Sequence, residues 1–188
     1  MLSSYVISTN SQSALSFLLA HPDKSHYERE IARGAKISYG SANNILNRLY
    51  KENLVKRKIE GRMCYYSIDM ANPYIKEFKI LNNLLLIESL IELLKPYARK
   101  IILYGSWAQG TDIENSDIDL FIITSDEDKV RSIVDKYSYT NKAANRKIQA
   151  IINTPADLLN TDEKEAVFME EVKQGKILWE REINEHNL

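Results

Sequence analysis

Residues 104–120 read YGSWAQGTDIENSDIDL, in which a glycine turn is followed by two aspartates that alternate with apolar residues. The apolar residues on either side of the turn predict two strands, Lys100 to Tyr104 and Ser116 to Thr124. Between them, Gly105 to Gln109 predicts a sharp turn that leads into a short helix. The stretch therefore predicts a strand, a turn and a second strand in close succession.

The two aspartates form the first candidate site. Asp117 and Asp119 lie two residues apart, which on a strand places both carboxylates on one face, about 6.7 Å apart. Ile118 and Leu120 then point to the opposite face, into a core. Like charges on one face repel each other, and Mg²⁺ removes that repulsion because it binds carboxylates together with phosphate oxygens. We therefore predict that Asp117 and Asp119 bind metal and are catalytic; the alternative is a surface turn.

The glycine turn forms the second candidate site. Gly105 lets the chain turn sharply, and the free backbone N–H groups that follow, with the Ser106 hydroxyl, favour an anion such as a triphosphate. We also assign Ser116, directly before the aspartates, to nucleotide binding. The spacing from Gly105 to Gly110 matches part of a Walker loop, but Thr111 stands where that motif requires lysine, so a Walker loop is excluded.

The segments that follow alternate between helix and strand. Their apolar spacing predicts helices over Asp128 to Lys136, Pro155 to Leu159 and Glu163 to Gln174, and strands over Lys147 to Ile152 and Lys176 to Trp179. These elements predict a small mixed unit, so that the whole chain belongs to the α+β class. We expect Asp112 and Glu114, in the loop between the two candidate sites, to be solvated.

The pattern Gly105-Ser106, ten further residues, then Asp117-Ile118-Asp119 resembles the signature of the DNA polymerase beta-type nucleotidyltransferase superfamily, and in particular its minimal members. The resemblance covers roughly residues 96 to 180. It implies up to two Mg²⁺ ions on the aspartates and an NTP, most simply ATP, with its phosphates at the glycine turn. It also implies transfer of a nucleotidyl group such as AMP to a hydroxyl acceptor, with release of pyrophosphate.

One position departs from this family pattern. The resemblance implies a third carboxylate on a neighbouring strand, and the strand from Lys147 to Ile152 carries Gln149 there. A neutral amide ligates metal weakly and is no general base, so metal and NTP binding could persist while transfer is slow or absent. Asp135 and Asp157 are the alternatives if the register of that strand is different, although neither lies on a convincing strand.

The N-terminal part predicts helices from Ser11 to His21, His26 to Ala32 and Tyr39 to Asn53, then strands from Leu54 to Ile59 and Cys64 to Ile68 around a Gly61 turn. Over roughly residues 11 to 69 this order resembles a winged helix-turn-helix. A long helix from Asn72 to Pro96 follows. We therefore expect a winged helix at 1–70, a connecting helix at 71–95 and a nucleotidyltransferase domain at 96–188.

The third predicted helix has the pattern of a DNA-reading helix. With Ala42, Ile45 and Leu49 facing inward, its outer face carries amides and a cation suited to base edges and phosphates. We assign DNA binding to Tyr39, Asn43, Asn44, Asn47 and Arg48, and to Arg62 on the wing, beside further cations at Lys56, Arg57 and Lys58. The alternative is a winged helix used for protein contacts or dimerisation.

Charge is distributed unevenly between the two halves of the chain, which supports a separate function for each. The 188 residues have a net charge of −1, but residues 1–70 hold ten Lys and Arg against six Asp and Glu, giving +4, and residues 71–188 hold fifteen against twenty, giving −5. A single cysteine, Cys64, excludes an intrachain disulfide framework, and no apolar run approaches the length of a membrane helix. We expect a cytoplasmic protein with His21, His26 and His186 at its surface.

Two functions fit these observations. The first is an Mg²⁺-dependent nucleotidyltransferase coupled to a winged helix that binds double-stranded DNA. Minimal domains of this family imply an antitoxin-like role in which a partner toxin is the protein acceptor, and winged-helix regulators imply a homodimer that reads two half-sites. The second is a transcriptional regulator whose degenerate nucleotidyltransferase domain senses NTP; Gln149 favours it, whereas Asp117 and Asp119 favour the enzyme.

Overall fold

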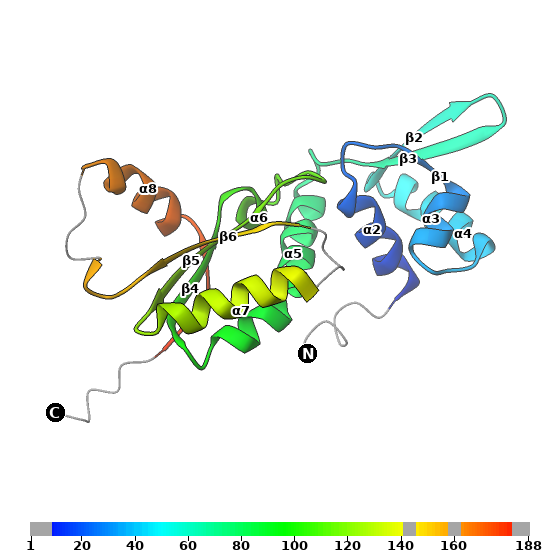
Figure 1. Ribbon diagram of the computed structural model, residues 1–188. Coiled ribbons are helices and arrows are strands. Elements are labelled where there is room, and N and C mark those ends of the chain that lie inside the picture. The colour runs from blue at the N-terminus through cyan, green and yellow to red at the C-terminus, as the bar shows by residue number, and fades with distance from the viewer. Residues whose placement is uncertain (1–8, 141–145, 158–162, 182–188) are drawn as a thin grey trace. The chain divides into compact units, whose positions relative to one another are not determined.

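The computed structural model describes residues 9–140, 146–157 and 163–181 (Figure 1). The chain forms two compact units, Met1–Leu85 and Leu86–Leu188. The boundary between them falls inside one helix, α5 (Pro73–Leu94), which contributes residues to both units. Each unit is described by itself below. No helix among the described residues is both long enough and apolar enough to cross a membrane.

The first unit combines three helices with a three-stranded sheet. Its elements are α2 (Asn10–Ala20), β1 (His26–Tyr27), α3 (Glu28–Gly34), α4 (Tyr39–Lys51), β2 (Val55–Glu60) and β3 (Met63–Ile68). The predicted helix over His26 to Ala32 is therefore wrong at its start, because the first two residues pair with β3 as a short strand. The sheet has the order β1-β3-β2, and both pairings are antiparallel.

Caps and apolar spacing explain the helices of this unit. The Thr9 side chain accepts a hydrogen bond from the Gln12 N–H and closes a capping box before α2, and the Ser38 hydroxyl accepts from the Ser41 N–H before α4. One buried cluster joins the helices to the sheet and to the start of α5, with Leu18, Ile31, Leu46, Tyr66 and Ile75 among its members. Figure 1 shows β2 and β3 as a hairpin that extends beyond the helices. This arrangement is a winged helix.

The second unit is a mixed sheet with helices. Its elements after α5 are β4 (Ala98–Tyr104), α6 (Gly105–Gln109), β5 (Ile118–Thr124), α7 (Glu127–Thr140), β6 (Ile148–Asn153), α8 (Glu163–Lys173) and β7 (Lys176–Glu180). The sheet has the order β6-β5-β4-β7, in which β5 and β6 are parallel and the other pairings antiparallel. The α+β class predicted from the sequence is confirmed.

The two faces of this sheet are both apolar along β4 and β5. Ile101, Leu103, Leu120 and Ile122 are buried on one face. On the other face, Phe168 of α8 packs its ring 5.6 Å from the ring of Tyr104 and 6.0 Å from that of Phe121. The face that carries α8 is also the face of Asp119, because Tyr104 and Asp119 are directly paired across β4 and β5.

Two predicted boundaries differ from the structure. The predicted strand over Ser116 to Thr124 begins only at Ile118, since the two residues before it belong to the loop that Ser116 closes. The predicted helix from Pro155 to Leu159 is a turn at its start, where the Asp157 carboxylate accepts hydrogen bonds from the backbone and side chain of Thr154. Residues 158 and 159 lie outside the described residues.

Candidate active site and nucleic-acid interface

Three neighbouring strands place one side chain each at the centre of the candidate active site. Tyr104 on β4 pairs with Asp119 on β5, and Asp119 pairs with Gln149 on β6. Residues that are directly paired across strands share a face, so Gln149 lies on the face of Asp119, as the sequence predicts. Neither Asp135, which lies in α7, nor Asp157, in the turn after β6, takes that position.

Asp117 joins this group from the loop just before β5. The Gln149 side chain donates a hydrogen bond from Nε2 to the Asp117 Oδ2 atom. The loop itself is held by Ser116, whose hydroxyl accepts from the Ile113 N–H at 2.9 Å, and by Arg146, which donates to the carbonyl oxygens of Ile113 and Ser116. The amide of Gln149 therefore holds the Asp117 carboxylate in place.

Asp119 is the less satisfied of the two carboxylates. It is half-buried and forms no hydrogen bond with any residue that the structure describes. Its pKa is raised, first by burial and then by the negative charges of Asp117 and Glu171. A half-buried carboxylate without donors, beside a second carboxylate, is a donor set that fits a hard cation such as Mg²⁺.

Gly105 presses directly against Asp119. Its φ of +66° lies in the left-handed region, and a Cβ atom built there would lie 2.7 Å from the Asp119 Oδ2 atom. Any side chain at this position would collide with the carboxylate, so both the conformation and the space require glycine. The start of α6, with Ser106, is thereby held against Asp119.

The other loop residues are more enclosed than the sequence suggests. Asp112 is 4% exposed, so the expectation that it is solvated is wrong. Trp107 is buried in α6, and the Arg146 guanidinium lies 5.7 Å from the centre of its ring.

Ser106 and Ser116 are half-buried beside the aspartates. The Ser116 hydroxyl accepts one hydrogen bond and can still donate one of its own. Across the described part of the chain, no three His, Cys, Asp or Glu side chains stand close enough together to hold a metal ion.

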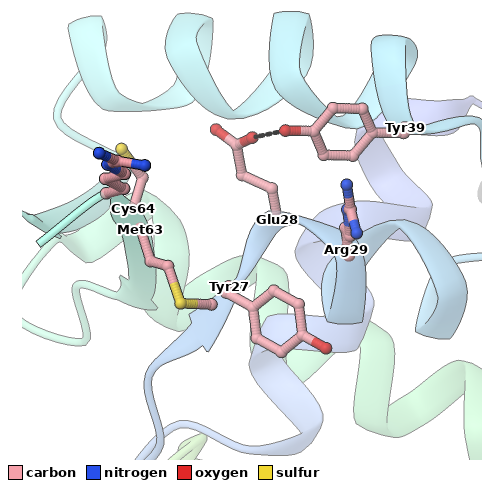
Figure 2. A pocket seen from close by; sticks show the side chains of 7 residues that line it. Tyr27, Glu28, Arg29, Tyr39, Met63 and Cys64 are labelled. Carbon is pink, nitrogen blue, oxygen red and sulfur yellow. Dashed lines mark hydrogen bonds between the residues drawn. The ribbon is translucent and has the colours of Figure 1, made fainter. Parts of the chain in front are cut away.

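The face of α4 assigned to DNA divides into occupied and open side chains. Tyr39 donates a hydrogen bond to the carboxylate of Glu28, the first residue of α3, at 2.8 Å (Figure 2). Asn43 donates to the same carboxylate at 3.0 Å. Asn47 donates to Asn43. Asn44 and Arg48 are exposed, and their side chains form no hydrogen bond or ion pair with a described residue. These two are therefore the assigned residues of α4 that are open to a ligand. The other three are also engaged within the fold.

Ion pairs occupy two of the four cations on the wing. Lys56 pairs with Asp69 at 2.9 Å and Lys58 with Glu60 at 2.6 Å. The Arg57 guanidinium turns toward the helices and donates to the Cys64 sulfur at 3.2 Å, so Cys64 accepts a hydrogen bond rather than being a purely apolar side chain. Arg62, in the exposed turn of the wing, pairs with no described carboxylate. It is the wing cation most available to a phosphate.

The model of the polymerase beta nucleotidyltransferase family matches residues 88–184 of the chain, which is just over half of its length. The chain belongs to this family. No curated protein matches it. The family match includes the glycine turn, both aspartates and Gln149.

The solved structures similar to this nucleotidyltransferase-family chain include a transcription regulator and a repressor. MepR, a transcription regulator of a Staphylococcus aureus multidrug efflux pump, has 17% identity and a TM-score of 0.38 over 48% of this chain and 68% of MepR. ZitR of Lactococcus lactis has 21% identity and a TM-score of 0.37 over 52% of this chain and 67% of ZitR. AdcR, the adhesin competence repressor of Streptococcus pyogenes, has 18% identity and a TM-score of 0.38 over 52% of this chain and 74% of AdcR.

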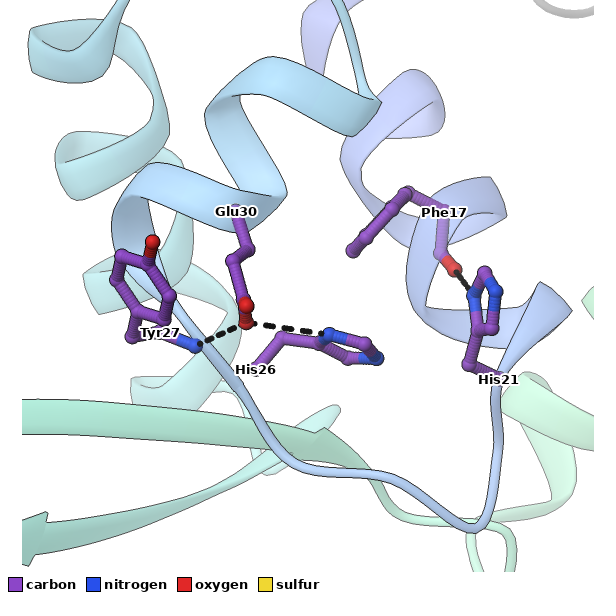
Figure 3. A network of polar contacts seen from close by, with 5 residues as sticks. All are labelled: Phe17, His21, His26, Tyr27 and Glu30. Atoms are coloured by element: carbon purple, nitrogen blue, oxygen red, sulfur yellow. Dashed lines mark hydrogen bonds and ion pairs between the residues drawn. The ribbon is translucent and has the colours of Figure 1, made fainter.

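Sequence reasoning missed a histidine cluster in the winged helix of this family member. The rings of His21 and His26 lie 5.4 Å apart, and both contact the ring of Phe17 (Figure 3). Burial and the neighbouring His21 lower the pKa of His26, although an ion pair with Glu30 at 3.4 Å opposes the shift. The expectation of a surface residue is therefore wrong for His26, and His186 lies outside the described residues.

Proposed function

We propose that this chain is an Mg²⁺-dependent nucleotidyltransferase that moves AMP from ATP to a hydroxyl acceptor, and that its winged helix binds double-stranded DNA. The observation that carries the first part is the half-buried Asp119 carboxylate, without hydrogen-bond donors among the described residues, against the Gly105 turn in a polymerase beta-family domain. The second part is supported by the open side chains of Asn44 and Arg48.

Asp117 and Asp119 would hold the metal. Bound there, Mg²⁺ would neutralise charge on the phosphates and lower the pKa of the attacking hydroxyl. The backbone N–H and the hydroxyl of Ser106, at the start of α6, would orient the triphosphate. The Ser116 hydroxyl would donate a hydrogen bond to a phosphate oxygen. Gly105 keeps this turn in contact with Asp119, so that bound phosphates would lie beside the carboxylates.

The proposed reaction exchanges one phosphorus–oxygen bond for another. A bond forms between the acceptor oxygen and the α-phosphorus, and the bond from the α-phosphorus to the oxygen that bridges to the β-phosphorus breaks. Pyrophosphate leaves with that electron pair, and the hydroxyl proton passes to water. Because Gln149 is an amide, it positions Asp117 but does not accept this proton. We therefore expect transfer to be slow.

Incubation of the full chain with Mg²⁺, ATP labelled at the α-phosphate and a whole-cell lysate as acceptor pool tests the proposal. The control is an Asp117→Ala/Asp119→Ala variant. We expect label on a discrete acceptor, protein or nucleic acid, only with the wild type. Label that binds reversibly without transfer would contradict the transferase and leave an NTP-responsive DNA-binding regulator, whereas equal labelling by the variant would contradict the site.

A further inference from the structure

Glu28, the first residue of α3, lies against α4 and β3, and sequence reasoning did not select it. Its carboxylate accepts three hydrogen bonds from two elements: from the Tyr39 hydroxyl and the Asn43 amide of α4, and from the Tyr66 hydroxyl of β3 at 3.3 Å. Tyr66 is buried, whereas Glu28 is half-buried. The carboxylate is therefore fixed in position from both sides.

The three donors leave part of the carboxylate free. A carboxylate offers about four acceptor positions. Asn43 and Tyr66 both donate to Oε1, and only Tyr39 donates to Oε2. Among the interactions of the described residues, Oε2 therefore keeps one lone pair for a further donor. A negative charge that faces an anionic ligand is unfavourable unless the ligand brings a donor to it.

A pocket of about 340 Å³ opens beside this carboxylate. It is bounded by α3, the start of α4 and the turn of the wing, with Tyr27, Arg29, Arg62, Met63 and Cys64 among its lining residues. Figure 2 shows the Tyr39 hydroxyl directed at Glu28, with Arg29 beside the tyrosine and Met63 and Cys64 opposite. The Arg29 guanidinium lies 5.7 Å from the centre of the Tyr39 ring. Two exposed arginines thus flank one fixed carboxylate.

A fixed carboxylate between two arginines would discriminate among the base edges of a bound duplex. Arginines at the rim suit the phosphates on either side of a groove, whereas a carboxylate repels phosphates and the carbonyl acceptors of guanine and thymine. Cytosine presents an N4 amino donor in the major groove without an adjacent ring acceptor, and adenine places its N7 acceptor beside its amino group. Of the four bases, cytosine therefore fits a lone carboxylate acceptor best.

We propose that Glu28 is a specificity-determining residue of the DNA interface and selects a cytosine by accepting a hydrogen bond from its N4 amino group. Arg29 and Arg62 bind the flanking phosphates. Tyr39 and Asn43 position the carboxylate instead of reading bases themselves. The inference rests on the proposed DNA binding of this unit and does not depend on nucleotidyl transfer.

Selection of duplexes from a random-sequence pool by the full chain tests the proposal, and Glu28→Gln is the deciding variant. Glutamine has the same shape but offers a donor where the carboxylate offers an acceptor. Glu52→Gln is the matched control, because Glu52 is an exposed residue just after α4, outside the pocket, and its substitution removes the same charge. Replacing the selected C·G pair by T·A then exchanges the amino group for a carbonyl group.

We expect wild type and Glu52→Gln to favour the C·G duplex over the T·A duplex by about fivefold or more, and Glu28→Gln by less than about twofold. Retention of the preference by Glu28→Gln, or a selected consensus without a fixed cytosine, would overturn the inference while leaving DNA binding intact. Failure of the wild type to retain any duplex would instead remove the proposed DNA binding, and the inference with it.

A second variant covers the case in which Glu28→Gln does not fold. Tyr39→Phe removes one donor to the carboxylate but leaves its charge and the buried Tyr66 in place. We expect a folded protein, by circular dichroism, whose cytosine preference is weaker by about twofold to threefold because the carboxylate is less well fixed. An undiminished preference would show that Tyr39 does not position the carboxylate and would overturn that part of the inference.

Discussion

Gly105 is the residue at which the turn and the carboxylates of the candidate active site touch. Alanine at this position would need a left-handed backbone and would place a methyl group against Asp119. We expect Gly105→Ala to lower the free energy of unfolding by roughly 1–3 kcal/mol and to weaken Mn²⁺ binding. Gly40→Ala is the control, because nothing lies within 4 Å of its Cβ position; alanine there should raise stability by up to about 1 kcal/mol. Denaturant titration would measure the change in the free energy of unfolding for both variants. Equal changes would contradict the contact between Gly105 and Asp119.

Gln149 is the residue that substitutes a hydrogen bond for a charge. Gln149→Glu would place a third carboxylate beside Asp117 and Asp119, so we expect about tenfold tighter Mn²⁺ binding, measured by electron paramagnetic resonance. In a chelator, the same variant should unfold at a lower temperature because like charges repel. Gln174→Glu adds the same charge to an exposed turn and should change neither quantity. Unchanged Mn²⁺ affinity in Gln149→Glu would exclude this strand from the metal site.

Asp119 should make stability depend on pH. Its raised pKa means that the folded chain binds more protons than the unfolded chain from the ordinary value of 3.8 upward, so this group lowers stability as the pH rises through that window. We expect Asp119→Asn to unfold at a higher temperature than the wild type at pH 7 without divalent cations, and the difference to vanish below pH 3.8. Added Mg²⁺ should favour the wild type instead. Thermal scans across this range would contradict the shift if the two curves stayed parallel.

The helix α4 and the wing form one surface because Arg57 of β2 donates a hydrogen bond to Cys64 of β3 and contacts the rings of Tyr50 in α4 and Tyr66 in β3. Arg48 projects from this surface without a partner among the described residues. We expect Arg48→Ala to weaken binding to a selected duplex by about tenfold, a loss within the usual range for an arginine at a base edge. Lys51→Ala, at the end of the same helix, is the control. Fluorescence anisotropy at fixed salt would measure both, and equal losses would indicate a general charge effect.

The helix α5 belongs to both compact units. Ile75 is buried in the cluster of the winged helix, Phe78 packs against it, and the Ser16 hydroxyl bonds to Asn82 at 2.9 Å. A fragment of residues 1–70 lacks these contacts, so we expect it to be less stable than residues 1–85 by several kcal/mol, in line with the loss of buried side chains from a core. Circular dichroism during heating compares the two fragments. Equal midpoints would show that the winged helix ends before α5.

The elements of both units could be predicted from the sequence because apolar periodicity is a local signal. Ile45, Leu46 and Leu49 are buried in α4 at the predicted spacing. The register that sets Gln149 beside Asp119 also follows from alternation along two parallel strands. By contrast, Glu28 binds residues 11, 15 and 38 positions away, and no local pattern marks such a contact. The burial of Asp112 and the edge-to-face contact between His21 and His26 depend on tertiary packing in the same way.

The pair of Gln149 and Gly105 has a consequence for mutation in the gene. A single-base change converts either glutamine codon to a glutamate codon. Position 149, which pairs with Asp119 across β5 and β6, can therefore gain a carboxylate by one mutation. No codon change at Gly105 is comparable, because any side chain there meets the same oxygen atom. Random mutagenesis of the gene should therefore recover gains of metal binding at codon 149 and only losses at codon 105.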